Sequence, residues 1–125
     1  MKKAGFLFTG LFFLLLSLNV KAQTSTASYF AGKWSVLVKG TPNGDVKMNF
    51  ILENNNDTLT GFVQDTTGAE ISKISGVDQK ENEITIYFTA QGYDVNVVLT
   101  KKDDDHANGS LMGMFDAEGE RIKQQ

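Results

Sequence analysis

The sequence predicts an all-β fold: a single antiparallel up-and-down meander of about eight short strands that forms a small closed or nearly closed barrel. Two observations carry this prediction. After residue 22, apolar side chains recur with a period of two, and no stretch keeps the 3.6-residue period of a helix. Turn residues interrupt this alternation at the spacing that is typical of such a meander. A β-sandwich is the alternative arrangement.

The individual strands follow from the alternation. It is cleanest at 83–89 and 46–53, where apolar residues occupy every second position. The other expected strands lie at 33–39, 59–63, 71–75, 94–101, 111–115 and 120–124. Turns are expected between them, for example at Thr41–Asp45, because proline presets φ and Asn-Gly tolerates positive φ. We expect the segment 101–108 to be a charged loop.

The N-terminus has the pattern of a signal peptide over residues 1–22. Two lysines precede an uncharged apolar run that is short for a spanning helix, and small residues close the segment where a signal peptidase reads. We expect cleavage between Ala22 and Gln23, a flexible leader at 23–28 and a single domain at 29–125. The mature protein would then be periplasmic or secreted; an uncleaved membrane anchor is the alternative.

Composition narrows the classes of partner. Nine basic and fifteen acidic residues follow position 22, so the expected mature chain carries a net charge of about −6. An acidic domain without a basic stripe binds nucleic acid and anionic membranes poorly. The sequence contains no cysteine, which excludes disulfides, thiol catalysis and lipid attachment to an N-terminal cysteine. We expect no nucleic-acid partner and no membrane insertion after cleavage.

One face of the expected strands collects the side chains that would fill the interior. The inward set comprises Trp34, Val36, Val38, Val46, Met48, Phe50, Leu52, Leu59, Val63, Ile84, Ile86, Phe88, Val95, Val97, Leu99, Leu111 and Phe115. An eight-stranded barrel has room for its own side chains or for one small ligand. Because this set is bulky and the strands are short, we expect a largely filled interior. A ligand that enters the barrel is expected to contact Trp34, Phe50, Phe88 and Phe115.

The opposite face also carries apolar residues. Leu37, Ile51, Phe62, Tyr87, Val98, Met112 and Met114 point outward in these registers. Several apolar side chains on adjacent strands form a patch, and methionine and aromatic residues suit an adaptable interface. We therefore expect a partner surface that includes Phe62, Tyr87, Met112 and Met114. Its partner would be a second copy of the chain or another exported protein.

A weak internal repeat indicates two related halves. The segment from Leu59 through Gly61 to Ile71 resembles the segment from Leu111 through Gly113 to Ile122. Each copy follows a polar loop and an alternating strand, which favours a symmetric eight-stranded arrangement. Both glycines fall on an apolar strand face. We expect them to bend the sheet, with clearance for a ligand or for a large side chain as the alternative.

Two short motifs resemble strand segments of known barrel families, and a third resembles a modification signal. Gly32-Lys33-Trp34 resembles the start of the first strand in calycin barrels, the lipocalins and fatty-acid-binding proteins. The resemblance implies a barrel whose floor is plugged by Trp34. Leu59-Thr60-Gly61 is similar to a strand motif of avidin-type barrels. Asp57-Thr58-Leu59 resembles an O-glycosylation signal of exported bacterial proteins, which implies a glycan on Thr58.

The residues that could support catalysis are few. His106, the only histidine, lies in a hydrophilic segment where we expect a solvated turn residue. A Ser–His–Asp hydrolase would need it buried beside a nucleophile, and no Gly-x-Ser-x-Gly is present. A calcium loop beginning at Asp104 would place Phe115, which cannot chelate, at its last ligand position. A weak cation site on Asp103–Asp105 is the alternative. We expect no enzymatic activity, no bound metal and no cofactor.

Two functions are consistent with these patterns. The first is a non-catalytic binding or interaction module outside the cytoplasm. The second is a lipocalin-like carrier that holds a small apolar ligand in the barrel interior. The two differ in whether the folded barrel is filled or hollow.

Overall fold

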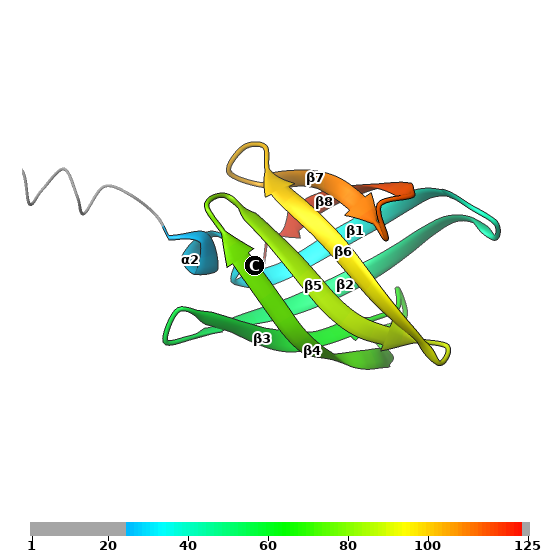
Figure 1. Cartoon of the computed structure of the whole chain (residues 1–125), viewed down its shortest axis with the longest axis horizontal. Coiled ribbons are helices and arrows are strands. Elements are labelled where there is room, and N and C mark those ends of the chain that lie inside the picture. The colour runs from blue at the N-terminus through cyan, green and yellow to red at the C-terminus, as the bar shows by residue number, and fades with distance from the viewer. Residues whose placement is uncertain (1–24, 124–125) are drawn as a thin grey trace, which may run out of the picture.

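The computed structural model describes residues 25–123 and forms a closed barrel of eight antiparallel strands (Figure 1). Its elements are α2 (Thr26–Phe30), β1 (Gly32–Thr41), β2 (Gly44–Asn55), β3 (Thr58–Gln64), β4 (Glu70–Lys80), β5 (Glu83–Ala90), β6 (Tyr93–Lys101), β7 (His106–Leu111) and β8 (Phe115–Ile122). The predicted signal peptide, its cleavage site at Ala22 and Gln23, and the start of the leader lie outside the described residues.

Each strand pairs with its neighbours in the chain, and β1 pairs with β8 to close the sheet. The predicted up-and-down meander is therefore confirmed, and the barrel replaces the sandwich alternative. Tight turns join the hairpins. Between β2 and β3, Asn56 and Asp57 have φ values of 54° and 66°, a left-handed pair that asparagine and aspartate tolerate and that matches the twist of a hairpin.

The core is the side of the sheet that the two-residue period selects. Every member of the predicted inward set is buried or packs partly buried against the buried cluster. The rings of Phe50 and Phe88 meet edge to face inside the barrel, with their centroids 5.6 Å apart. Among the described residues no polar or charged side chain is buried, so apolar packing dominates the interior.

The structure contains one short helix that the sequence analysis did not expect. Residues 26–28, which we assigned to the leader, form the first part of α2. Ser25 caps this helix, since its side chain accepts a hydrogen bond from the backbone N–H of Ser28. Ala27 and Phe30 are buried. Five residues are too few to show a helical period, and contacts with the barrel hold them in place.

The last two strands differ from their predicted bounds. The expected strand at 111–115 is wrong: β7 ends at Leu111, and a turn over residues 112–114 leads into β8. The expected charged loop at 101–108 is correspondingly shorter. The reason is that β7 and β8 bury small residues, Ala107 and Ala117, which give no hydrophobic alternation. Strand β4 also extends beyond the expected 71–75.

The two glycines of the internal repeat, Gly61 and Gly113, are not equivalent in the structure, contrary to the prediction. Gly113 lies in the β7–β8 turn with φ of 70°, so it bends no strand. The counterpart of Gly61 is Gly109, and these residues lie opposite Leu52 and Leu99 respectively. A Cβ atom on Gly61 would lie 1.8 Å from the carbonyl oxygen of Ile51, and one on Gly109 would lie 1.7 Å from that of Val98. Both halves of the barrel therefore need a glycine where two strands approach closely.

Candidate functional site

One end of the barrel is closed by a helix, and the other end is open. Helix α2 lies at one end, shown at the left in Figure 1, beside the turns that follow β2, β4 and β6. The Thr26 hydroxyl donates to the carbonyl of Lys80 at 2.8 Å and accepts from the N–H of Asn82 at 3.2 Å. These bonds tie the helix to the β4–β5 turn. The helix is thus a plug for this end.

Two side chains of the barrel, Trp34 and Arg121, bind the helix. Trp34 is fully buried, and its Nε1 donates to the carbonyl of Phe30 at 3.0 Å. Arg121 reaches from β8 and donates to the carbonyl of Tyr29 at 2.6 Å and to that of Ala31 at 3.2 Å. The carbonyl groups at the end of a helix have no partner within it, so these donors satisfy them.

The Tyr29 hydroxyl connects the helix to the β6–β7 loop. It donates to the carbonyls of Asp103 and His106, the latter at 2.9 Å. Burial raises the pKa of Tyr29, so the phenol stays protonated and can serve as this donor. Lys101 Nζ and the guanidinium carbon of Arg121 lie over the Tyr29 ring, 4.7 and 5.1 Å from its centroid. These contacts join the helix, the last strand and the β6–β7 loop at the closed end.

The opposite end is open. A cavity of about 220 Å³ lies between the ends of β1, β2, β5, β6 and β7. Its lining consists of Val38, Thr41, Asn43, Val46, Met48, Phe88, Ala90, Gln91, Val95 and Leu111. Seven of these side chains are apolar, and none of them is ionisable. The cavity can therefore receive an apolar group but offers no acid or base.

Of the four predicted ligand contacts, the structure brings one to this cavity. Phe88 lines it, and Phe115 lies partly buried at the same end, paired with Leu111. Phe50 is buried deeper, and Trp34 belongs to the closed end. The alternation in the sequence marked all four as inward but did not say at which depth each one lies.

The predicted partner surface is divided. Tyr87 and Met112 lie on either side of Asn96. Tyr87 pairs with Asn96 across β5 and β6, and the backbone N–H of Met112 donates to the Asn96 carbonyl. Phe62 is partly buried on β3, two strands away from Tyr87. Met114 lies in the β7–β8 turn at the open end.

The open end also gathers exposed apolar side chains, of which Met112 and Met114 belong to the predicted partner surface and Tyr93 and Ile71 do not. Tyr93 is 74% exposed and Met114 is 69% exposed, and both lie in or beside turns at this end. Met112 and Ile71 are about two-fifths exposed there as well. The turns at the closed end, by contrast, are built from polar residues such as Asn54–Asp57. The placement of α2 therefore separates an end with polar turns from an end with exposed apolar side chains.

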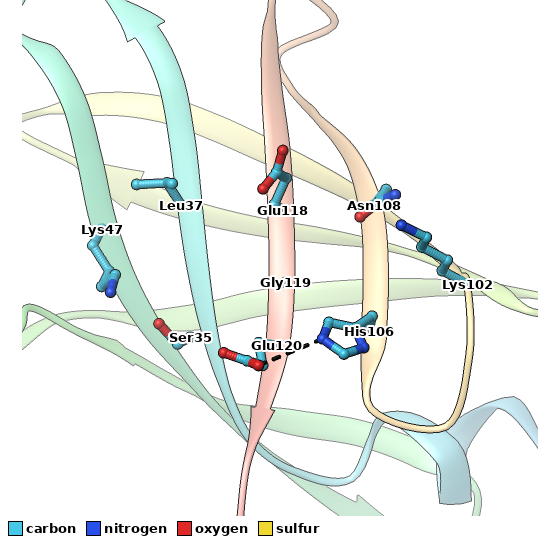
Figure 2. Close-up of a pocket in the computed structure, with 9 residues that line it drawn as sticks. All are labelled: Ser35, Leu37, Lys47, Lys102, His106, Asn108, Glu118, Gly119 and Glu120. Atoms are coloured by element: carbon cyan, nitrogen blue, oxygen red, sulfur yellow. Dashed lines mark ion pairs between the residues drawn. The ribbon is translucent and has the colours of Figure 1, made fainter.

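A second hollow, of about 370 Å³, lies on the outer wall over β8 (Figure 2). It is lined by Ser35, Leu37, Lys47, Lys102, His106, Asn108, Glu118, Gly119 and Glu120. His106 is the first residue of β7 rather than a loop residue. Its Nδ1 lies 2.8 Å from the carboxylate of Asp103 and its Nε2 lies 3.4 Å from that of Glu120.

These contacts determine what His106 can do. The hydrogen bond with Asp103 raises the pKa of His106, and the same bond lowers the pKa of Asp103. Both ring nitrogens face carboxylates, and in Figure 2 Ser35 lies on the far side of Glu120 from the ring. The arrangement is therefore an exposed ion pair and does not resemble a nucleophile–base pair.

Within residues 25–123, no group of three or more histidine, cysteine, aspartate or glutamate residues is arranged to hold a metal ion. Within the same range, no helix has the length and apolar character needed to cross a bilayer.

The fold and the plugged end define the class of this protein as a small, closed, eight-stranded β-barrel. Neither a protein-family description nor a curated protein matches the sequence. Among solved structures, the chain is similar to a redesigned β-barrel, with 16% identity and a TM-score of 0.55 over 82% of this chain and 98% of that one. It is also similar to a de novo designed fluorescence-activating β-barrel, with 14% identity and a TM-score of 0.51 over 82% of this chain and 100% of that one. At these identities the likeness shows the barrel fold alone.

Proposed function

We propose that this chain is an exported, non-catalytic interaction module with a calycin-like barrel, and that its open end receives an apolar side chain of a partner. The carrying observation is the apolar cavity of about 220 Å³ at that end. Pockets for small molecules commonly measure about 300–1,000 Å³. The cavity is smaller than that and suits one large side chain, which is how a central anchor residue engages a protein interface.

The surroundings of the cavity support a macromolecular partner. Tyr93, Met112 and Met114 are exposed at the same end. A small ligand held inside the cavity would leave these side chains in water, whereas a partner surface would cover them. Tyrosine and methionine are frequent in interfaces because they combine apolar area with adaptable contacts.

The calycin-like character rests on the position of Gly32-Lys33-Trp34. These residues begin β1, and the position of Trp34 beneath the plugging helix supports this part of the proposal. The absence of catalysis in the proposal is supported by the open-end lining, which holds no ionisable side chain. Export is supported by the pattern of residues 1–22. It is tested by the mass of the protein recovered from its own host, which should correspond to a chain that begins at Gln23.

A carrier of a small apolar ligand is the second candidate. The apolar lining favours it, because Phe88 and Met48 connect the cavity to the core. Native mass spectrometry of protein from its own host separates the two functions. A stoichiometric small molecule supports the carrier, and a clean apo mass supports the interaction module.

The interaction module is tested by titration with acetyl-leucine amide, followed by methyl NMR. We expect shifts at Val38, Val95 and Leu111, which line the cavity, and none at Val36 or Leu99.

The matched variant is Ala90→Phe, since Ala90 lines the cavity and a phenyl ring there would occupy it. We expect this variant to keep the melting temperature within a few degrees and to abolish the shifts. Acetyl-alanine amide should produce weaker shifts than the leucine compound, because it buries less apolar area. Equal shifts at both ends of the barrel, or shifts that survive Ala90→Phe, would overturn the proposal.

A further inference from the structure

The charged residues at the open end are mostly acidic. This end is formed by residues 39–47, 64–71, 90–95 and 111–117, which together hold five carboxylates and two lysines. The carboxylates are Asp45, Asp65, Glu70, Asp94 and Asp116. All lie in turns or in the strand ends next to them.

The two lysines offset these five carboxylates only in part. Lys39 Nζ lies 2.7 Å from Glu118 Oε2, and this hydrogen bond, with smaller contributions from the nearby Asp45 and Asp116, raises the pKa of Lys39. Lys47 lines the outer hollow shown in Figure 2. Within residues 25–123, none of the five open-end carboxylates takes part in an ion pair, whereas Asp103 and Asp105 beside the closed end both do.

One of these carboxylates is held in its charged form by its own loop. Asp65 Oδ1 accepts from the backbone N–H groups of Thr67 at 2.9 Å and Ala69 at 3.1 Å, and also from the Thr67 hydroxyl. These bonds, led by the one from the hydroxyl, lower the pKa of Asp65. The open end therefore carries more carboxylates than lysines, whereas the lining of its cavity holds no ionisable side chain.

We infer that the partner docks through a polypeptide segment in which an apolar side chain lies between basic residues. The apolar side chain would enter the cavity, and the basic residues would meet the carboxylates around it. Complementary charges speed encounter and select the partner, whereas like charges disfavour it. The same carboxylates disfavour an anionic lipid surface. Tyr93 adds an exposed aromatic ring that a basic side chain can cover. The inference rests on the proposed function, because it names the partner chemistry of the same site.

Three labelled peptides test it with the mature chain, by fluorescence anisotropy. The first places leucine between lysines, the second places leucine between glutamates, and the third places alanine between lysines. We expect the first to bind on the order of tenfold more tightly than the second at low salt, since a few exposed ion pairs of modest strength separate them. The difference should shrink at high salt, which screens exposed charges.

Variants connect the effect to the open-end carboxylates. The double variant Asp94→Asn with Asp116→Asn should reduce the preference for the basic peptide. Glu53→Gln is the matched control, because Glu53 is exposed on β2 toward the closed end. It should leave the preference unchanged. Ala90→Phe should weaken both leucine peptides.

The outcomes separate this inference from the proposed function. If both leucine peptides bind equally and Ala90→Phe weakens both, the cavity is a binding site and the charge inference is wrong. If the alanine peptide binds as well as the leucine peptide, or if Ala90→Phe changes neither, the proposed function fails. Sedimentation of the protein alone tests whether a second copy of the chain binds the open end. A dimer that Ala90→Phe dissociates would show this and would overturn the inference.

Discussion

The guanidinium carbon of Arg121 lies 4.6 Å from the centroid of the Trp34 ring, which joins the last strand of the barrel to the first. The same guanidinium binds the carbonyls of Tyr29 and Ala31 at the end of the plugging helix. Trp34 in turn donates to the carbonyl of Phe30. These two residues therefore link closure of the sheet to closure of one barrel end. The open end lacks such a device and keeps the cavity.

Replacement of Arg121 by methionine should destabilise the protein. It removes the hydrogen bonds that the guanidinium donates to the carbonyls of Tyr29, Ala31 and Asp104. It also removes the ion pair with Asp105 and the contact with the Trp34 ring. We expect a loss of about 2–4 kcal/mol in the free energy of unfolding, measured with urea. Lys123→Met is the control, since Lys123 is 73% exposed and pairs only with Asp105. Its effect should stay below about 0.5 kcal/mol. Equal losses in both variants would contradict the role given to Arg121.

Alanine at Gly61 should be far more harmful than alanine at Gly76. A Cβ atom on Gly61 would overlap the carbonyl oxygen of Ile51, and its φ of 151° is unfavourable for other residues. We expect Gly61→Ala to cost at least about 3 kcal/mol, because two strands must separate. A Cβ atom on Gly76 meets nothing within 4 Å, and Gly76→Ala should change the stability by less than about 1 kcal/mol. Chemical denaturation of both variants decides the matter; similar midpoints would refute the close approach.

Removal of the Tyr29 hydroxyl should loosen the β6–β7 loop. Tyr29→Phe takes away the donor for the carbonyls of Asp103 and His106 and should cost about 1–2 kcal/mol. Hydrogen exchange should rise in the loop at 102–105. Tyr87→Phe is the matched control, since the exposed Tyr87 hydroxyl donates only to Asp78. It should have little effect on stability or on exchange.

The pair of His106 and Asp103 should make stability depend on pH. Because the pKa of His106 is raised from its ordinary value of 6.5, the folded protein favours the protonated ring. Its contribution is complete below 6.5 and is lost as the pH rises through the raised pKa. The pKa of Asp103 is lowered from 3.8, so its contribution is complete above 3.8 and is lost as the pH falls through the lowered pKa.

The stabilisation from this pair is thus greatest between pH 3.8 and 6.5. Urea midpoints across this range and above it, together with NMR titration of the imidazole, provide the measurement. Asp103→Asn removes the larger cause of the shift, so it should lower the pKa of His106 more than Glu120→Gln does. A His106 that titrates identically in the wild type and in Asp103→Asn would disprove the pairing.

The residues that the structure places at the open end illustrate how far the sequence could lead toward a site. Phe88 was predicted correctly as an inward residue, and it lines the cavity. Ala90 and Gln91 gave no signal, because small and polar residues near a turn are common in any meander. Their role depends on which end of the barrel α2 closes, and that is set by contacts such as Thr26 with Lys80.

The sequence by itself determined the sheet and its inner face. Successive side chains on a strand point to opposite sides, so the spacing of residues such as Ile84, Ile86 and Phe88 defined the interior without any knowledge of the partners of each strand. The tertiary structure alone decided the bounds of β7 and β8, the helix, and the difference between the two ends. There the buried positions hold small residues, Ala107 and Ala117, and five helical residues stay folded through contacts with distant strands. Contacts between residues far apart in the chain leave no periodic trace in it, and for this reason only the closed barrel revealed them.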